Sequence, residues 1–279
     1  MHIETPLVEH ARLPGIRLKL EALQPSGSFK IRGIGHLCRH HVERGATCLV
    51  SSSGGNAGLA TAWAGRRLGV EVLVVTPETT PEWVRERIRA LGARVEVHGA
   101  AWDDADAYAR SLSGAYVHPF DDPLVRKGHS TLIDELPDEP RAIVVSVGGG
   151  GLLCGVAEGL ERRGWSTPIL AVETEGAASL AAAIKADRVV DIGAITSIAK
   201  TLGARRVAEE TLAWTRRREV RSVVVSDAQA LMACRRFAED HRILVEPSCG
   251  AALAAMEDLD RGVVVVCGGS GVRPADLLP

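Results

Sequence analysis

The chain has 279 residues, 46% of them hydrophobic and 24% charged, which argues against a disordered protein and allows a substantial core. Its formal net charge of -2 gives no electrostatic basis for binding nucleic acid or an anionic membrane surface. No stretch approaches the roughly 18 apolar residues that span a bilayer, and residues 1–10 lack the basic start and apolar run of a secretion signal. The six cysteines are scattered without a CxxC pair, as expected for reduced thiols. We therefore expect a cytoplasmic protein with neither nucleic-acid nor membrane partners.

Short apolar runs alternate with helix-like segments along the chain. The expected strands are residues 47–50, 71–76, 94–97, 142–147, 169–172, 222–225 and 263–267. The expected helices are residues 56–68, 81–91, 101–111, 152–163, 227–240 and 250–259. Several runs are apolar throughout, as in strands that are buried on both faces. This alternation predicts an α/β fold with largely parallel sheets.

The expected strands fall into two groups, one before residue 120 and one after residue 123. We predict two lobes with a cleft between them. The small domain would be residues 27–120, and the large domain would combine residues 1–26 with residues 121–279. We detect no internal repeat and no long linker.

The first segment with chemical character is Pro25-Ser26-Gly27-Ser28-Phe29-Lys30-Ile31-Arg32-Gly33. It places Lys30 just inside the start of a helix, where the backbone dipole favours anions over cations. An amine that forms an imine, or that lies beside a bound phosphate, would remove this conflict. The local sequence alone leaves an ordinary surface lysine as an equal alternative.

Residues 51–58 (SSSGGNAG) follow an expected strand and precede an expected helix. Exposed backbone N–H groups at such a junction form a site for a carboxylate or a phosphate. The alternative is that Asn56 only caps the helix.

Residues 146–155 contain four consecutive glycines, Gly148 to Gly151, after a buried strand. Such a loop lets the backbone approach a ligand closely, and a phosphate at the next helix N-terminus fits best. A dinucleotide-binding fingerprint is the rival, because Glu173 ends the following strand where a ribose-binding acid would lie. No GxGxxG register closes, however, since Cys154 occupies the position of the third glycine.

The last segment, residues 263–271, is a strand that ends in a glycine-rich turn. Ligands of open α/β sheets gather beyond the carboxyl ends of the strands, so Cys267 is expected at the site. A lone cysteine is more often an inert buried hydrophobe, and no base is identified that would make this one a nucleophile.

Together these segments resemble the fold-type II pyridoxal-phosphate enzymes, and most closely the L-serine dehydratases (serine ammonia-lyases) of the serine-dehydratase-like branch. The resemblance covers nearly the whole chain, from Thr5 to Ser270. It includes the further motifs at residues 119–123, 172–174, 197–203 and 245–252. It implies a fold like that of the tryptophan synthase β chain, with two open, largely parallel twisted sheets in two lobes and the cofactor in the cleft.

The resemblance also implies roles for individual residues. Lys30 would hold pyridoxal 5'-phosphate as a Schiff base and Phe29 would stack on its ring. Asn56 would bind the ring hydroxyl, and Cys267 would face the pyridine nitrogen. The phosphate would be bound by Gly148, Gly149, Gly150, Gly151 and Leu152. The substrate carboxylate would be bound by Ser53, Gly54, Asn56 and Ala57. A monovalent cation, usually K+, would be bound by Glu173 and by oxygens around Gly148, Ala177, Ser179, Leu202 and Ala204.

The chain departs from the family pattern at three of these positions. Gly54 stands where the liver-type enzymes have alanine, which could alter substrate fit or rate. Thr201 stands at a ring-facing position that is often alanine. Ala204 replaces a larger aliphatic residue, a change that a backbone ligand would survive.

The predicted reaction is loss of water and ammonia from L-serine, with L-threonine as a second substrate, in a homodimer. Lys30 would remove the Cα proton, which requires a lowered amine pKa. A thiol at Cys267 would leave the ring nitrogen largely neutral and so favour elimination. The alternatives are a serine racemase, for which Ser53 would supply the second acid–base group, or another fold-type II lyase. An NAD-binding oxidoreductase and an amino-acid sensor that lacks activity are more distant alternatives.

Overall fold

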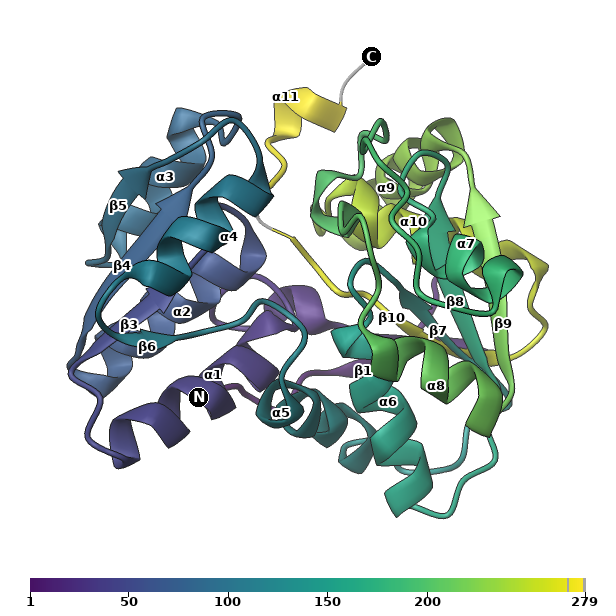
Figure 1. Ribbon diagram of the computed structural model, residues 1–279. Coiled ribbons are helices and arrows are strands. Elements are labelled where there is room, and N and C mark those ends of the chain that lie inside the picture. Colours follow the sequence, from purple (N-terminus) through teal and green to yellow (C-terminus); the bar gives the residue numbers. More distant parts are fainter. Residues whose placement is uncertain (270, 278–279) are drawn as a thin grey trace.

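Two sheets organise the chain, as the computed structural model shows for residues 1–269 and 271–277. Ser270, which belongs to the last motif above, lies outside the described residues. Figure 1 shows one sheet and its helices on the left, the other sheet and its helices on the right, and α1, α5 and α6 below them. The expected α/β class is confirmed. In the described part of the chain, no helix is long and apolar enough to cross a membrane.

The smaller sheet has the strand order β5-β4-β3-β6, and all of its strands are parallel. Its strands are β3 (Cys48–Ser51), β4 (Glu71–Thr76), β5 (Arg94–Val97) and β6 (Ala115–Tyr116). The helices of this part are α1 (Lys30–Glu43), α2 (Asn56–Leu68), α3 (Glu82–Ala90) and α4 (Trp102–Ser111). Leu49 and Val74 pack with α1, α2 and α3, whereas Val50 and Val75 pack with α4. Both faces of the sheet are therefore buried, which explains the unbroken apolar runs.

The larger sheet has the strand order β1-β2-β10-β7-β8-β9, in which only the pairing of β1 with β2 is antiparallel. Its strands are β1 (Leu7–Glu9), β2 (Ile16–Lys19), β7 (Ile143–Ser146), β8 (Ile169–Thr174), β9 (Val220–Val225) and β10 (Gly262–Val265). The α-helices of this part are α5 (Pro123–Asp134), α6 (Gly151–Arg162), α7 (Ser179–Ala186), α8 (Glu209–Arg217), α9 (Asp227–His241), α10 (Pro247–Ala255) and α11 (Pro274–Leu277). Three short 3-10 helices complete the list: η1 (Glu21–Leu23), η2 (Lys200–Leu202) and η3 (Met256–Asp258).

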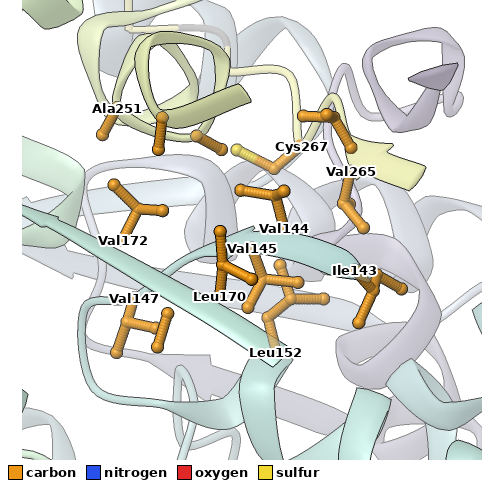
Figure 2. Packing of buried hydrophobic residues seen from close by; sticks show 14 of the residues in the cluster. Ile143, Val144, Val145, Val147, Leu152, Leu170, Val172, Ala251, Val265 and Cys267 are labelled. Carbon is orange, nitrogen blue, oxygen red and sulfur yellow. The ribbon is translucent and has the colours of Figure 1, made fainter. Parts of the chain in front are cut away.

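The core of the larger part joins this sheet to the surrounding helices, which include α6 and α10. Figure 2 shows Val144, Leu170 and Val265 side by side below the helix that carries Ala251. These side chains belong to one cluster of buried residues, and Cys267 lies at its edge. Because β7, β8 and β10 are parallel neighbours, their carboxyl ends lie close together, and the loops that follow them begin there.

All seven expected strands are present, with ends that differ by at most two residues. The helix expected at residues 250–259 begins earlier, at Pro247, because Pro is favoured in the first turn. The predicted domain division remains a prediction. It is consistent with the sheets, since β3 to β6 lie within residues 27–120 and the other strands lie outside that range.

Candidate active site

Lys30 is the first residue of α1, and the helix start has no side-chain cap. The residue is half-buried, and its Nζ donates a hydrogen bond of 2.8 Å to the carbonyl of Pro119. Burial lowers the pKa of Lys30 to about 8, although the nearby Cys267 and Glu246 act in the opposite direction. These contacts do not fit an ordinary surface lysine. They give an amine that is partly neutral near neutral pH.

The turn before Lys30 is bound to the strand end that carries Cys267. The backbone N–H of Phe29 donates to the carbonyl of Cys267 at 3.1 Å, and Ser28 forms an isolated bridge with Gly268. Gly268 has a φ of +88° and a Cβ there would meet the Gly27 carbonyl at 2.5 Å, so glycine is required for this close approach. The structure thus brings Lys30, Phe29 and Cys267 together, although some 237 positions separate the first and last of them.

Cys267 is buried, and its thiol shares a hydrogen bond with Cys249. This hydrogen bond and burial both raise the pKa of Cys267 well above its ordinary value. Figure 2 shows its side chain between β10 and the helix that carries Ala251. The thiol therefore stays neutral, so it is poorly suited to be a nucleophile and well suited to be a weak partner of a ring nitrogen.

The four glycines lie where β7 turns into α6. Gly150 has a φ of +96° and precedes the first residue of α6, again without a side-chain cap. A Cβ at Gly149 would overlap the ring of Phe120, and one at Gly151 would meet the Phe120 carbonyl at 2.7 Å. The first N–H groups of α6 are thus left open to an anion, and Leu152 follows in the same turn.

The loop between β3 and α2 is built without a capping side chain. Asn56 is the first residue of α2, and its Nδ2 donates to Glu246 Oε1 at 2.8 Å instead of capping the helix. The alternative that Asn56 only caps α2 is therefore wrong. Ser53 Oγ accepts from the Gly55 N–H at 3.2 Å, and Gly54 packs directly against Thr80. Ala57 follows in the first turn of α2, so the four predicted substrate contacts lie in one loop and helix start.

Glu246 is the site residue that sequence reasoning missed. Its buried carboxylate accepts hydrogen bonds from Asn56, from the Thr201 hydroxyl and, at 3.1 Å, from the Gly271 N–H. Burial raises the pKa of Glu246, and these hydrogen bonds oppose the shift. The sequence feature that could have pointed to Glu246 was the motif at residues 245–252, in which this glutamate directly precedes a proline that starts a helix. Its partner Asn56 lies 190 positions away, beyond the reach of local pattern.

Glu173 is the penultimate residue of β8, and its side chain is fully buried. Its two carboxylate oxygens accept from the N–H groups of Leu180 and Ala181 at 2.7 and 2.8 Å, in the first turn of α7. Burial raises the pKa of Glu173 to about 7 against these hydrogen bonds. Both carboxylate oxygens of Glu173 are thus engaged by the first turn of α7, which argues against its being the ribose-binding acid of a dinucleotide site.

The predicted cation ligands form two neighbourhoods. Glu173 lies beside the start of α7, where the buried Ser179 Oγ has no hydrogen-bond partner among the described residues. Ala177 precedes this turn. A Cβ on Gly148 would lie 3.0 Å from Leu202 Cα, and the Leu202 carbonyl accepts from the Ala204 N–H at 2.7 Å. No cluster of three or more acidic, histidine or cysteine side chains occurs in the described part of the chain.

The arrangement fits pyridoxal phosphate. The turn before α6 requires glycine, because Cβ atoms at Gly149 and Gly150 would overlap Phe120 and Thr211. The Ser146 hydroxyl beside this turn is buried without a hydrogen-bond partner in the described range. Lys30 offers an amine of lowered pKa and Cys267 a neutral thiol, both joined to the same turn.

Comparison with known proteins supports this reading. The family model described as pyridoxal-phosphate dependent enzyme matches residues 1–268. The L-serine dehydratase/L-threonine deaminase of Mus musculus is 46% identical, over 99% of this chain and 94% of the relative. A fungal L-serine ammonia-lyase from Rhizomucor miehei superposes with a TM-score of 0.93 at 38% identity, covering 99% of this chain and 96% of that chain. Maize serine racemase superposes with a TM-score of 0.90 at 24% identity, covering 99% and 91%, which shows a shared fold. The chain belongs to the family of pyridoxal-phosphate-dependent enzymes.

Proposed function

We propose that this protein is an L-serine ammonia-lyase, which converts L-serine to pyruvate and ammonia and L-threonine to 2-oxobutyrate and ammonia. The observation that carries the proposal is the position of Lys30, whose amine has a pKa of about 8 and lies beside Cys267 at the start of α1. The similarity of nearly the whole chain to enzymes of this name supports the choice of reaction.

The cofactor would be held by residues of both parts of the molecule. Lys30 would carry it and Phe29 would lie against its ring, while Asn56 would bind the ring hydroxyl and Cys267 would face the ring nitrogen. The phosphate would be bound by backbone N–H groups at Gly148, Gly149, Gly150, Gly151 and Leu152. When bound, pyridoxal phosphate supplies an electron sink for the charge that remains on the substrate Cα after its proton is removed.

The substrate is a small amino acid whose carboxylate is oriented by the N–H groups and side chains of Ser53, Gly54, Asn56 and Ala57. This position at the start of α2 suits an anion. The Lys30 amine accepts the Cα proton. With a pKa of about 8, roughly one-tenth of this amine is neutral at pH 7, far more than for an ordinary lysine. Loss of the Cα proton and of the β-hydroxyl together releases one water, and hydrolysis of the remaining enamine by a water molecule then gives ammonia and the keto acid.

A monovalent cation, K+ by our proposal, would stiffen the region below the glycine turn. Its ligands would be Glu173 and oxygens at Gly148, Ala177, Ser179, Leu202 and Ala204. The Ser179 hydroxyl, for which the described residues offer no hydrogen-bond partner, and the close approach of Gly148 to Leu202 support this assignment. We further propose that the protein is a cytoplasmic homodimer, and light scattering in solution tests the oligomeric state.

Racemisation of serine is the second candidate for the same fold. It requires an acid–base group on the opposite face of Cα, and Ser53 is the hydroxyl that the substrate loop offers beside Gly54. Chiral analysis of the serine that remains after partial turnover separates the two reactions. Accumulation of D-serine faster than pyruvate would contradict the lyase assignment.

The test of the proposed function is an assay of pyruvate and 2-oxobutyrate from each amino acid, with and without K+. We expect pyruvate from L-serine, and we expect Lys30→Ala to lose turnover by about 1,000-fold or more together with the visible absorbance of the lysine-bound cofactor. Lys127→Ala, at an exposed lysine of α5, is the control and should behave as the wild type. Undiminished turnover by Lys30→Ala would overturn the role of this residue.

A further inference from the structure

Thr201 closes a chain of three polar side chains that borders the site. Its hydroxyl lies within hydrogen-bond distance of the Glu246 carboxylate and, at 2.5 Å, of the Ser248 hydroxyl. Ser248 and Glu246 are buried, whereas Thr201 is exposed on the side that faces the substrate loop. A Cβ built on Gly55 would lie 3.6 Å from Thr201 Cγ2, which places the threonine beside that loop.

The donor and acceptor of each of these hydrogen bonds follow from the number of hydrogens available. A hydroxyl carries one hydrogen, so Thr201 cannot donate to both of its neighbours. With Glu246 ionised, Thr201 donates to the carboxylate, and Ser248 must then donate to Thr201. The hydrogen bond from Ser248 orients the Thr201 hydroxyl so that its hydrogen points at the Glu246 carboxylate. The effect of Ser248 on Glu246 therefore passes through Thr201, and we describe the two hydroxyls as acting in series.

Glu246 transmits this constraint across the site. The same oxygen that accepts from Thr201 accepts from Asn56 Nδ2, while the second oxygen accepts from the Gly271 N–H. Thr201 and Glu246 lie in the larger part of the molecule, and Asn56 starts α2 in the smaller part. Fixing the carboxylate therefore fixes the amide of Asn56 relative to Lys30 and Cys267.

We infer that Thr201 and Ser248 are positioning residues that act in series through Glu246 to orient Asn56 toward cofactor and substrate. This inference rests on the proposed function. Alanine at position 201 would lack the hydroxyl and so could not form the series.

The experiment is a double-mutant cycle with Thr201→Val, Ser248→Ala and the double variant. The readouts are the dissociation constant of pyridoxal phosphate from the apo-protein, and KM and kcat for L-serine. Loss of a hydrogen bond to a carboxylate should weaken cofactor binding by about tenfold in Thr201→Val, with a rise in KM that exceeds the fall in kcat. Ser248→Ala should weaken binding in the same direction, by no more than Thr201→Val does.

The double variant tests whether the two hydroxyls act in series, because the free-energy changes of two mutations in one series do not add. We expect it to match Thr201→Val within about twofold, and we expect Thr201→Ser to retain wild-type binding. A double variant equal to the product of the single effects would overturn the series, as would wild-type cofactor binding and KM in Thr201→Val. The matched control is Thr167→Val, which removes a buried hydroxyl that donates to the Pro140 carbonyl at 2.8 Å. Thr167 lies just before the amino-terminal end of β8, whereas the proposed site lies at the carboxyl ends of the strands. If the wild type formed no pyruvate, the proposed function would fail, while the cycle in cofactor affinity would still test the series.

Discussion

At the scale of single residues, the protonation of Lys30 decides when the site can work. Burial lowers its pKa to about 8, and the free amine is the form that can bond to the cofactor. We therefore predict that the rate at which the apo-protein captures pyridoxal phosphate rises with pH and levels off above about 8. Below that value the neutral fraction falls tenfold per pH unit, so the rate at pH 6 should be roughly one-hundredth of its plateau. Stopped-flow absorbance measures this rate.

A plateau reached only near pH 10.5, the value of an unperturbed lysine, would contradict the burial effect. Lys30→Arg serves as the control. It keeps the positive charge at the start of α1 but cannot form the bond, so it should give no signal at any pH.

Gly54 is held against Thr80 in the proposed substrate loop. A Cβ at this position would overlap Thr80 Oγ1 and would lie 3.1 Å from Thr80 Cβ. Gly54→Ala should therefore displace the loop and raise KM for L-serine, by roughly tenfold for a misfit of 1–2 kcal/mol. Thr80→Ala removes the overlapping atoms, so the double variant should regain most of the lost activity. An equal loss in Gly54→Ala with and without Thr80→Ala would show that Thr80 is not the obstacle.

At the scale of elements, His129 marks the junction of α1, α5 and α6. It is fully buried, its ring packs 4.9 Å from that of Phe29, and neither ring nitrogen has a hydrogen-bond partner among the described residues. Cβ atoms at Gly33 and Gly155 would overlap it, so both helices approach it through glycine. Burial first, and then the charges of Lys30, Arg32 and His2, lower its pKa well below 6.5.

The sign of the resulting pH dependence follows from proton binding. Below pH 6.5 the unfolded chain binds a proton at His129 that the native protein does not, so stability falls as the pH falls. We predict that the free energy of unfolding of the wild type decreases by up to about 1.4 kcal/mol per pH unit more steeply than that of His129→Leu below pH 6. Urea titrations from pH 7 to pH 5 measure both slopes. His98→Leu, at an exposed histidine, should keep the wild-type slope, and parallel slopes for His129→Leu would refute the argument.

The elements that sequence reasoning found and those it missed differ in their physical cause. Continuous apolar runs such as that of β4 are determined by burial on both faces, and they were predicted to the residue. In contrast, β1 and β2 are short and mixed in polarity, and they pair only because β10 lies next to β2. The helix α5 had a readable signal that we overlooked, since Asp122 caps it at 2.7 Å and Pro123 follows.

The candidate site was predictable wherever a local pattern carries the chemistry. The glycine turn is of this kind, whereas the local sequence left Lys30 and an ordinary surface lysine as equal alternatives, and only the resemblance to the family favoured a role at the site. The bond between Asn56 and Glu246 is not of this kind, because it depends on how two sheets are placed relative to one another. The same holds for the role of Thr201, whose partners are set by tertiary packing.

At the scale of the whole molecule, a buried cluster of charges joins α1 to the larger sheet. The fully buried Arg32 guanidinium forms two hydrogen bonds of 2.7 Å with Glu21 and bonds of 2.6 and 2.7 Å with Glu135. Lys19 of β2 donates to Glu135 at 2.5 Å and to the Thr5 carbonyl at 2.6 Å. These hydrogen bonds raise the pKa of Arg32 against its burial, and the Arg32 and Lys19 hydrogen bonds lower that of Glu135 against its own burial, so Arg32 and Glu135 both stay charged near neutral pH.

Removing the cation at the centre of this cluster should destabilise the whole fold. Arg32→Met leaves Glu21 buried without its ion-pair partner, and breaking a buried pair in this way costs about 3–5 kcal/mol. Arg162→Met is the matched control, because its 2.7 Å pair with Asp134 is exposed and should contribute about 1 kcal/mol or less. Urea unfolding measures both, and equal losses would contradict the argument. Arg32 lies one half-turn beyond Lys30 in α1, so Arg32→Met should also weaken cofactor binding, whereas Arg162→Met should not. The buried charges would then stabilise the fold and hold Lys30 in position at the same time.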